Sequence, residues 1–98
     1  MTRIPMMGET IKDTIGEPAM YEQLAEECTE LSHACQKLAR ILRGENPTPA
    51  RSEVVARNIN EELVDVILVA SEIGLVVDNE LMAQKRNRWR ERLEECKA

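Results

Sequence analysis

The chain has 98 residues and a mass of 11.2 kDa, enough for one domain with a modest core. Apolar residues make up 43% and charged residues 32%, a balance typical of folded rather than disordered chains. Phe is absent and only one Tyr and one Trp occur, which favours an all-α domain over a β-sandwich or barrel. The net charge of −5 argues against binding to a nucleic acid polymer, because its phosphate backbone requires a basic surface.

The first segments of the chain predict a short helix and then a long one. The short helix is expected near residues 9–15, before Gly16. Pro18 suits the first turn of the long helix, because its missing N–H has no partner there in any case. The long helix is expected to end at Arg43, since Gly44 follows it and glycine is common at the position just past a helix.

The second half of the chain predicts two further helices. Residues 44–50 contain one Gly and two Pro and indicate a turn. The third helix is expected from about Ser52 to 74–77, and Asp78 is expected to cap the fourth. Short connections between long helices predict antiparallel neighbours. We therefore expect residues 1–98 to form a single domain, a bundle of about four helices.

The cysteines and the N-terminal segment favour a reducing compartment. Cys28 and Cys35 are seven residues apart, about 10 Å along a helix, which is too far for a disulfide. Both fall at apolar positions, so we expect them to be small buried core residues. No apolar segment typical of a signal peptide and no long uncharged apolar run are present. These features predict a cytoplasmic protein that does not associate with membranes.

The expected second helix carries acidic residues beside its apolar stripe. At about 100° per residue, Glu27 falls inside the apolar arc, Glu30 lies at its edge and Glu26 points away. Glu27 and Glu30 therefore share one face of the helix. The stripe itself comprises Leu24, Cys28, Leu31, Cys35, Leu38 and Leu42.

The expected third helix is apolar nearly all round over residues 63–77. A helix of this kind is buried on most sides, and four short helices cannot easily cover it within one chain. We therefore expect a homo-oligomer with a large apolar interface. Asp65 interrupts the apolar run, and Glu62 lies one turn earlier on the same face. Burying such carboxylates without compensation would be unfavourable.

Antiparallel packing would bring the acidic pairs of the second and third helices together. Four carboxylates cannot all stay ionised side by side, because each raises the pKa of the others. A hard divalent cation compensates most simply, and oxygen ligands suit Mg²⁺ or Mn²⁺. The alternative is that each pair lies on an ordinary solvated helix face.

The expected fourth helix has a basic face made by Lys85, Arg88 and Arg92. Beside a carboxylate metal site, this face suggests a polyphosphate ligand. The alternative is that these cations stabilise the helix through its C-terminus and through pairs such as Arg88 with Glu91 or Glu95.

The two acidic segments together resemble the signature of a known family. Glu26-Glu27-Cys28-Thr29-Glu30 followed by Glu62-Leu63-Val64-Asp65 resembles the EExxE…ExxD motif of the all-α NTP pyrophosphatase superfamily. The similarity is greatest to small MazG-like nucleoside triphosphate pyrophosphohydrolases, including those of phage type. It covers roughly residues 9–95, because residues 16–24 resemble the family's lead-in helix and 85–93 its basic last helix.

The resemblance implies Mg²⁺-dependent hydrolysis of a nucleoside triphosphate to the monophosphate and pyrophosphate. It implies an active site completed by a neighbouring subunit of a homodimer or homotetramer. Glu26 would act near the metal or as a base, and Asn87 would contact sugar or phosphate. The metal ligands would be Glu27, Glu30, Glu62 and Asp65, and the phosphate contacts would be Lys85, Arg88 and Arg92.

Two other functions remain open at this point. The chain could be a non-enzymatic helical scaffold or regulator in which the carboxylates form interface ion pairs. It could also be a di-iron bundle, because Glu30-x-x-His33 matches half of that motif. We expect His33 to be exposed, since it lies opposite the apolar stripe. Trp89 is expected to pack in a core or interface rather than stack on a base.

Overall fold

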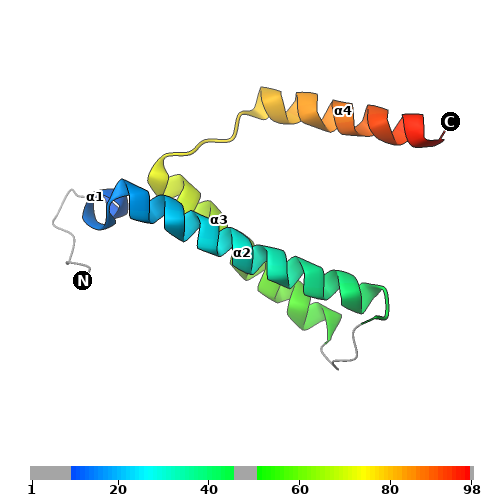
Figure 1. Ribbon diagram of the computed structural model, residues 1–98, viewed down its shortest axis with the longest axis horizontal. Helices are drawn as coiled ribbons and strands as arrows, with labels where there is room; N and C mark the ends of the chain where they lie inside the picture. The colour runs from blue at the N-terminus through cyan, green and yellow to red at the C-terminus, as the bar shows by residue number, and fades with distance from the viewer. Residues whose placement is uncertain (1–9, 46–50, 98) are drawn as a thin grey trace.

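The computed structural model describes residues 10–45 and 51–97, and all the regular structure in these ranges is helical. The four helices are α1 (Ile11–Ile15), α2 (Glu17–Leu42), α3 (Ser52–Ile73) and α4 (Asn79–Lys97), as Figure 1 shows. The predicted all-α class is confirmed. Within the described ranges, no helix combines the length and apolarity that a membrane span requires. Most of the expected turn, residues 46–50, lies outside them.

The start of the helical region is fixed by a capping box. The backbone N–H of Asp13 donates to the Thr10 hydroxyl at 3.0 Å, and the Asp13 carboxylate accepts from the Thr10 N–H at 3.4 Å. These hydrogen bonds hold the pKa of Asp13 below its ordinary value. Gly16 then separates α1 from α2, and Pro18 lies in the first turn of α2, as predicted.

Local hydrogen bonds also set the end of α3 and the start of α4. Gly74 ends α3 with φ at +97°, a left-handed conformation that favours glycine. The N–H of Leu75 donates to the carbonyl of Ala70 at 3.0 Å, as expected for a Schellman motif. Asp78 caps α4 as predicted, because its Oδ1 accepts the N–H of Leu81 at 3.0 Å.

Helices α2 and α3 lie side by side as an antiparallel hairpin, and α1 packs across one end of it (Figure 1). The buried core of the described chain is small and consists of Met20, Val55 and Ile73. Between these residues, Leu24, Leu31 and Leu38 are half-buried in the seam. The hairpin is therefore a thin two-helix layer with little interior of its own.

The inward face of α2 differs from the predicted stripe. Cys28 and Cys35 are exposed, so the prediction that they are core residues is wrong for the single chain. Leu42 is also exposed, whereas Ala34 and Ile41 are half-buried. Compared with the predicted stripe, the face of α2 that contacts α3 is rotated by about half of the 100° between successive residues, toward the side that carries Glu27.

Helix α4 stands apart from the other helices, joined to α3 by a short extended linker (Figure 1). Within the described residues it makes no helix–helix contact with α1, α2 or α3. Leu81, Met82, Trp89 and Leu93, which were expected to supply its apolar contacts, are exposed. The single chain therefore forms a three-helix unit with an extended fourth helix rather than a closed bundle.

Helix α3 is not buried on most sides within the single chain, contrary to the expectation from its apolar sequence. Val64, Ile67 and Leu68 in its middle are all exposed, and so is the linker residue Val76 at 90%. One thin hairpin can cover only one side of α3. The remaining sides face outward.

Candidate metal centre

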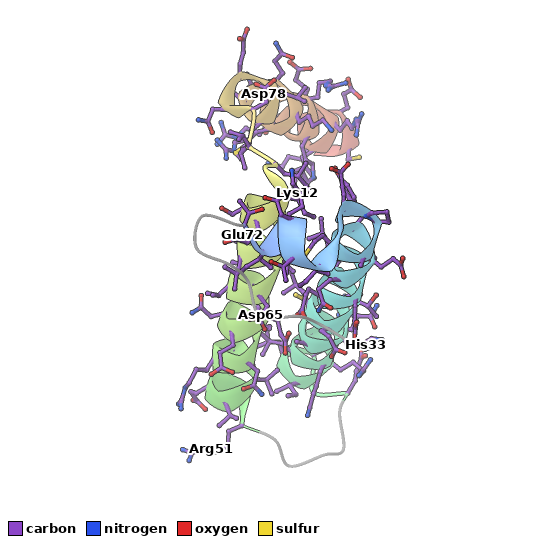
Figure 2. All side chains as sticks on the ribbon, turned by 90° about the vertical axis from the view of Figure 1, so that its left-hand side faces the viewer. Lys12, His33, Arg51, Asp65, Glu72 and Asp78 are labelled. Carbon is purple, nitrogen blue, oxygen red and sulfur yellow. The ribbon has the colours of Figure 1, made fainter. Side chains whose placement is uncertain are left out.

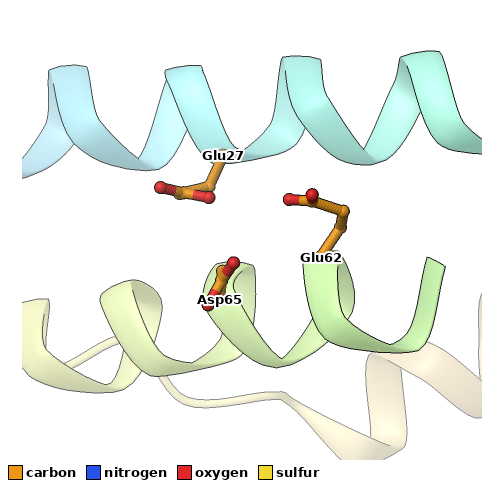
Figure 3. A group of neighbouring side chains, drawn as sticks. All are labelled: Glu27, Glu62 and Asp65. Atoms are coloured by element: carbon orange, nitrogen blue, oxygen red, sulfur yellow. The ribbon is translucent and has the colours of Figure 1, made fainter. Parts of the chain in front are cut away.

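Three carboxylates meet in the seam between α2 and α3. Glu27 approaches from α2, and Glu62 and Asp65 approach from successive turns of α3, as Figure 3 shows. Each contributes one oxygen to a group in which all three oxygens lie within 4.8 Å of one another. The predicted convergence of the two acidic segments is therefore present, with three of the four expected carboxylates.

The position of each carboxylate follows from its place on its helix. Glu27 lies between Leu24 and Leu31 on the inward face of α2, where it is half-buried. Its Oε1 accepts a hydrogen bond of 2.8 Å from Nε2 of Gln23, one turn earlier. Glu62 is half-buried on the inward face of α3, whereas Asp65 is exposed at the border of the seam. Figure 2 shows Asp65 where the two helices face each other.

The carboxylates disfavour one another's ionised form, and Glu62 is affected most. Loss of solvent in the seam raises the pKa of Glu62, and the negative charge of Asp65 raises it further. Glu30, Glu27 and Glu61 add smaller contributions in the same direction. The group is thus an unfavourable concentration of negative charge when no cation is bound.

The raised pKa of Glu62 predicts how the metal-free fold responds to pH. Because the folded state binds this proton more tightly than the unfolded state, the contribution of Glu62 to stability is greatest below its ordinary pKa of 4.5. It is lost as pH rises through the raised value. In EDTA, the melting temperature should therefore fall as pH rises above about 4.5. The contribution of Asp13, whose pKa is lowered, is fully present above its ordinary pKa of 3.8 and is lost only as pH falls below that value, so it does not affect this trend.

Thermal melts of wild type and Glu62→Gln across this pH range test the expectation. The variant cannot titrate at this position, so its melting temperature should decline less. Equal declines in the two proteins would contradict the assignment of the effect to Glu62.

The donor set fits a hard divalent cation. All three ligands are carboxylate oxygens, which Mg²⁺ and Mn²⁺ prefer. Opposite ligands of Mg²⁺ are about 4.2 Å apart, so oxygens within 4.8 Å need only small side-chain adjustments. In the part of the chain that the structure describes, no lysine or arginine forms an ion pair with Glu27, Glu62 or Asp65. Among the residues that the structure describes, the group thus has no cationic partner.

The other predicted acidic residues lie outside this group. Glu30 is exposed, yet it is near enough to Glu62 to raise its pKa, so it lies at the margin of the site. Glu26 is exposed and belongs to the side of α2 that faces away from the apolar seam. His33 is exposed, as predicted, and is not a member of the group, so the structure gives no support to the di-iron arrangement.

The predicted phosphate ligands gather on α4. Lys85, Arg88 and Arg92 line a hollow of about 340 Å³ together with Trp89. Asn87 is exposed on the same helix but does not line the hollow. Because α4 makes no contact with α2 or α3, one chain does not bring these residues to the carboxylates.

One residue beside the carboxylate group was missed by the sequence analysis, and one was assigned to packing. Gln23 holds Glu27, and its spacing of four residues from Glu27 on one helix is the signal that could have revealed it. Trp89 was expected to pack in a core or an interface, and in the single chain it is exposed beside three cations. An aromatic side chain one turn from several basic residues is itself a feature of nucleotide-binding surfaces.

Comparison of the chain with protein-family models, with curated proteins and with solved structures finds no match. What is established is therefore an all-α protein of four helices with an acidic group between two of them.

Proposed function

We propose that the protein is a Mg²⁺-dependent nucleoside triphosphate pyrophosphohydrolase, related to the MazG-like enzymes whose motif it resembles. The observation that supports this proposal is the meeting of Glu27, Glu62 and Asp65 oxygens within 4.8 Å of one another. A bound cation would offset the negative charges that, together with the loss of solvent, raise the pKa of Glu62. It would also explain why these carboxylates converge, which the alternative of ordinary solvated helix faces does not.

In this proposal the residues of the seam hold the cation. Glu27, Glu62 and Asp65 are its ligands, and Glu30, whose charge acts on Glu62 from the margin of the site, is the fourth ligand that the resemblance implies. Gln23 restrains Glu27 through its hydrogen bond and so reduces the conformational freedom that the Glu27 side chain loses when the cation binds. The cation, when bound, supplies neutralisation of phosphate oxygens and a more acidic water. The resemblance implies a role for Glu26 near the metal or as a base, but its side of α2 faces away from the seam, so no step is assigned to it.

The residues of α4 bind the substrate in this proposal. Lys85, Arg88 and Arg92 present three cations on one face and match the negative charge of a triphosphate. Trp89 beside them offers a face on which a base can stack, and exposed Asn87 offers an amide for the sugar. These groups reach the carboxylates only if α4 of a second copy approaches the hairpin or the linker bends.

A substrate panel tests the activity. Purified protein with Mg²⁺ should convert one or more ribo- or deoxyribonucleoside triphosphates to the monophosphate and an equal amount of pyrophosphate. Chromatography of the nucleotides together with a pyrophosphate assay separates this outcome from release of orthophosphate. Diphosphate and orthophosphate as products, or no turnover of any substrate with Mg²⁺ or Mn²⁺, would contradict the proposal.

The second candidate function is a non-enzymatic helical scaffold or regulator. The exposed apolar residues of α3 and α4 and the isolation of α4 favour this reading, because surfaces of this kind mark sites of protein association. The two candidates differ in their response to Mg²⁺. A scaffold would show no Mg²⁺-dependent change in melting temperature and no nucleotide turnover.

A further inference from the structure

Gln23 gives one of the three carboxylates a hydrogen-bond partner that the other two lack. Its Nε2 donates a hydrogen bond of 2.8 Å to Oε1 of Glu27, which lies one turn later on α2. Among the residues that the structure describes, no other side chain donates a hydrogen bond to Glu27, Glu62 or Asp65. Within the carboxylate group, Glu27 is therefore the member whose orientation is restrained.

The hydrogen bond restricts how the Glu27 carboxylate can meet a cation. Glu27 is half-buried in the seam, whereas Gln23 is exposed beside it. Figure 3 shows one oxygen of Glu27 on the side of Glu62 and Asp65, and the other pointing away from them. A carboxylate binds a cation through both oxygens only when both turn toward it. Such a rotation would move Oε1 relative to the Gln23 amide, so the hydrogen bond favours coordination through one oxygen.

The number of oxygens that each carboxylate offers distinguishes Mg²⁺ from Ca²⁺. Mg²⁺ requires nearly octahedral geometry at about 2.0–2.1 Å and keeps several waters beside a small number of carboxylate oxygens. Ca²⁺ accepts about 6–8 oxygens at about 2.3–2.6 Å and often binds both oxygens of one carboxylate. The carboxylate group, with one oxygen from each of Glu27, Glu62 and Asp65, suits Mg²⁺ and supplies few ligands for Ca²⁺.

The chemistry of the Gln23 side chain suits this restraint. Its amide donates a hydrogen bond without carrying a positive charge. A lysine or arginine at this position would partly neutralise Glu27 and compete with the cation, and a carboxylate would add to the repulsion. Gln23 therefore orients Glu27 and leaves the negative charge of the group available to the metal.

We propose that Gln23 sets the metal selectivity of the site: by its hydrogen bond it holds Glu27 to one oxygen and so favours Mg²⁺ over Ca²⁺. This inference rests on the metal site of the proposed function. It adds a residue to which the family resemblance gives no role, and a discrimination between two cations. Gln23 is a positioning residue, because it acts on the cation through Glu27.

Calorimetric titrations of the nucleotide-free protein with Mg²⁺ and with Ca²⁺ measure this selectivity. Gln23→Met keeps the length and helix propensity of the side chain but removes the donor. It should lower the ratio of the Ca²⁺ Kd to the Mg²⁺ Kd by about tenfold or more, the usual effect of losing a hydrogen bond that orients a metal ligand. Gln36→Met changes the other glutamine of α2, which is exposed and outside the carboxylate group, and should leave the ratio unchanged. An unchanged ratio in Gln23→Met, or equal weakening of both cations, would overturn the proposal.

Two further measurements separate positioning from a local effect on the helix. A hydrogen-bonded pair at a spacing of four residues also stabilises a helix slightly. If this were the only role of Gln23, Gln23→Met would lower the melting temperature in EDTA and leave the Kd ratio unchanged. Infrared difference spectra of the Ca²⁺-loaded proteins give a second signature, because the splitting of the carboxylate stretching bands narrows when both oxygens bind. The narrowing should be greater in Gln23→Met than in wild type, and equal spectra would contradict the proposal.

The result can be distinguished from that of the proposed function, because the titrations contain no nucleotide. Nucleotide turnover with Mg²⁺, together with an unchanged Kd ratio in Gln23→Met, would overturn the role of Gln23 alone. A Kd ratio that depends on Gln23, without turnover of any nucleotide, would overturn the hydrolase function alone. A wild-type protein that binds neither cation would overturn both.

Discussion

Replacing Glu62 with Gln should reduce kcat for nucleoside triphosphate hydrolysis by at least about 10²–10³-fold, the usual effect of losing one group that stabilises developing charge. Glu62 is half-buried between Glu27 and Asp65, and its pKa is raised first by loss of solvent and then by the charges of both neighbours. The amide keeps the shape of the side chain but removes the charge that holds the cation. The loss should therefore appear as a requirement for much higher Mg²⁺, as well as a lower maximal rate.

Glu61→Gln is the matched control for this experiment. Glu61 is an exposed neighbour on α3 that is not a member of the carboxylate group, so its variant removes the same charge one residue away. Its kcat should stay within a few fold of wild type. Steady-state rates over a Mg²⁺ titration compare the two variants. Similar losses in both would show that net charge, rather than the geometry of the group, controls the activity.

Mg²⁺ should raise the melting temperature of the wild-type protein by about 10–20 °C when its concentration is about a hundredfold above Kd. The large shift is expected because the small core leaves little stability in the metal-free chain. Asp65→Asn should have the opposite pattern. It removes a charge that raises the pKa of Glu62, so its metal-free melting temperature should exceed that of wild type by a few degrees, while its response to Mg²⁺ disappears.

Melts in EDTA and in a Mg²⁺ series distinguish this pattern from simple damage to the fold. Glu53→Gln in the first turn of α3 lies outside the carboxylate group and serves as the control for loss of one negative charge. It should retain the Mg²⁺ response. An Asp65→Asn protein that melts below wild type in EDTA would contradict the view that carboxylate repulsion destabilises the metal-free fold.

The helices could be predicted from the sequence because their ends are set locally. Gly74 adopts a positive φ, and Asp78 caps α4 through a bond three residues away. The face that α2 turns toward α3 was harder to predict. Leu24, Leu31 and Leu38 belong to both possible stripes, so the choice between the side of Cys28 and the side of Glu27 depended on what α3 presents. That information is not local to α2.

The meeting of the carboxylates could be predicted from local spacing, whereas the position of α4 relative to them could not. Glu27, Glu62 and Asp65 were assigned to the seam from their angles on two antiparallel helices, and the structure brings them together. The place of Lys85 and Arg88 relative to this group depends on how the linker directs α4. The spacing of residues within a helix does not determine where the linker directs α4, so the position of α4 could not be predicted from periodicity.

The isolation of α4 has a consequence for its own persistence. A helix of 19 residues without tertiary support is only marginally formed in water, because few local interactions offset the unfavourable nucleation step. Among the described ion pairs, α4 holds one between Lys97 and Glu94, both largely solvated, which adds little. The stability of this helix therefore depends on contact with another surface. Binding of α4 to such a surface and formation of its helix are then coupled, and α4 is expected to fray whenever that contact is absent.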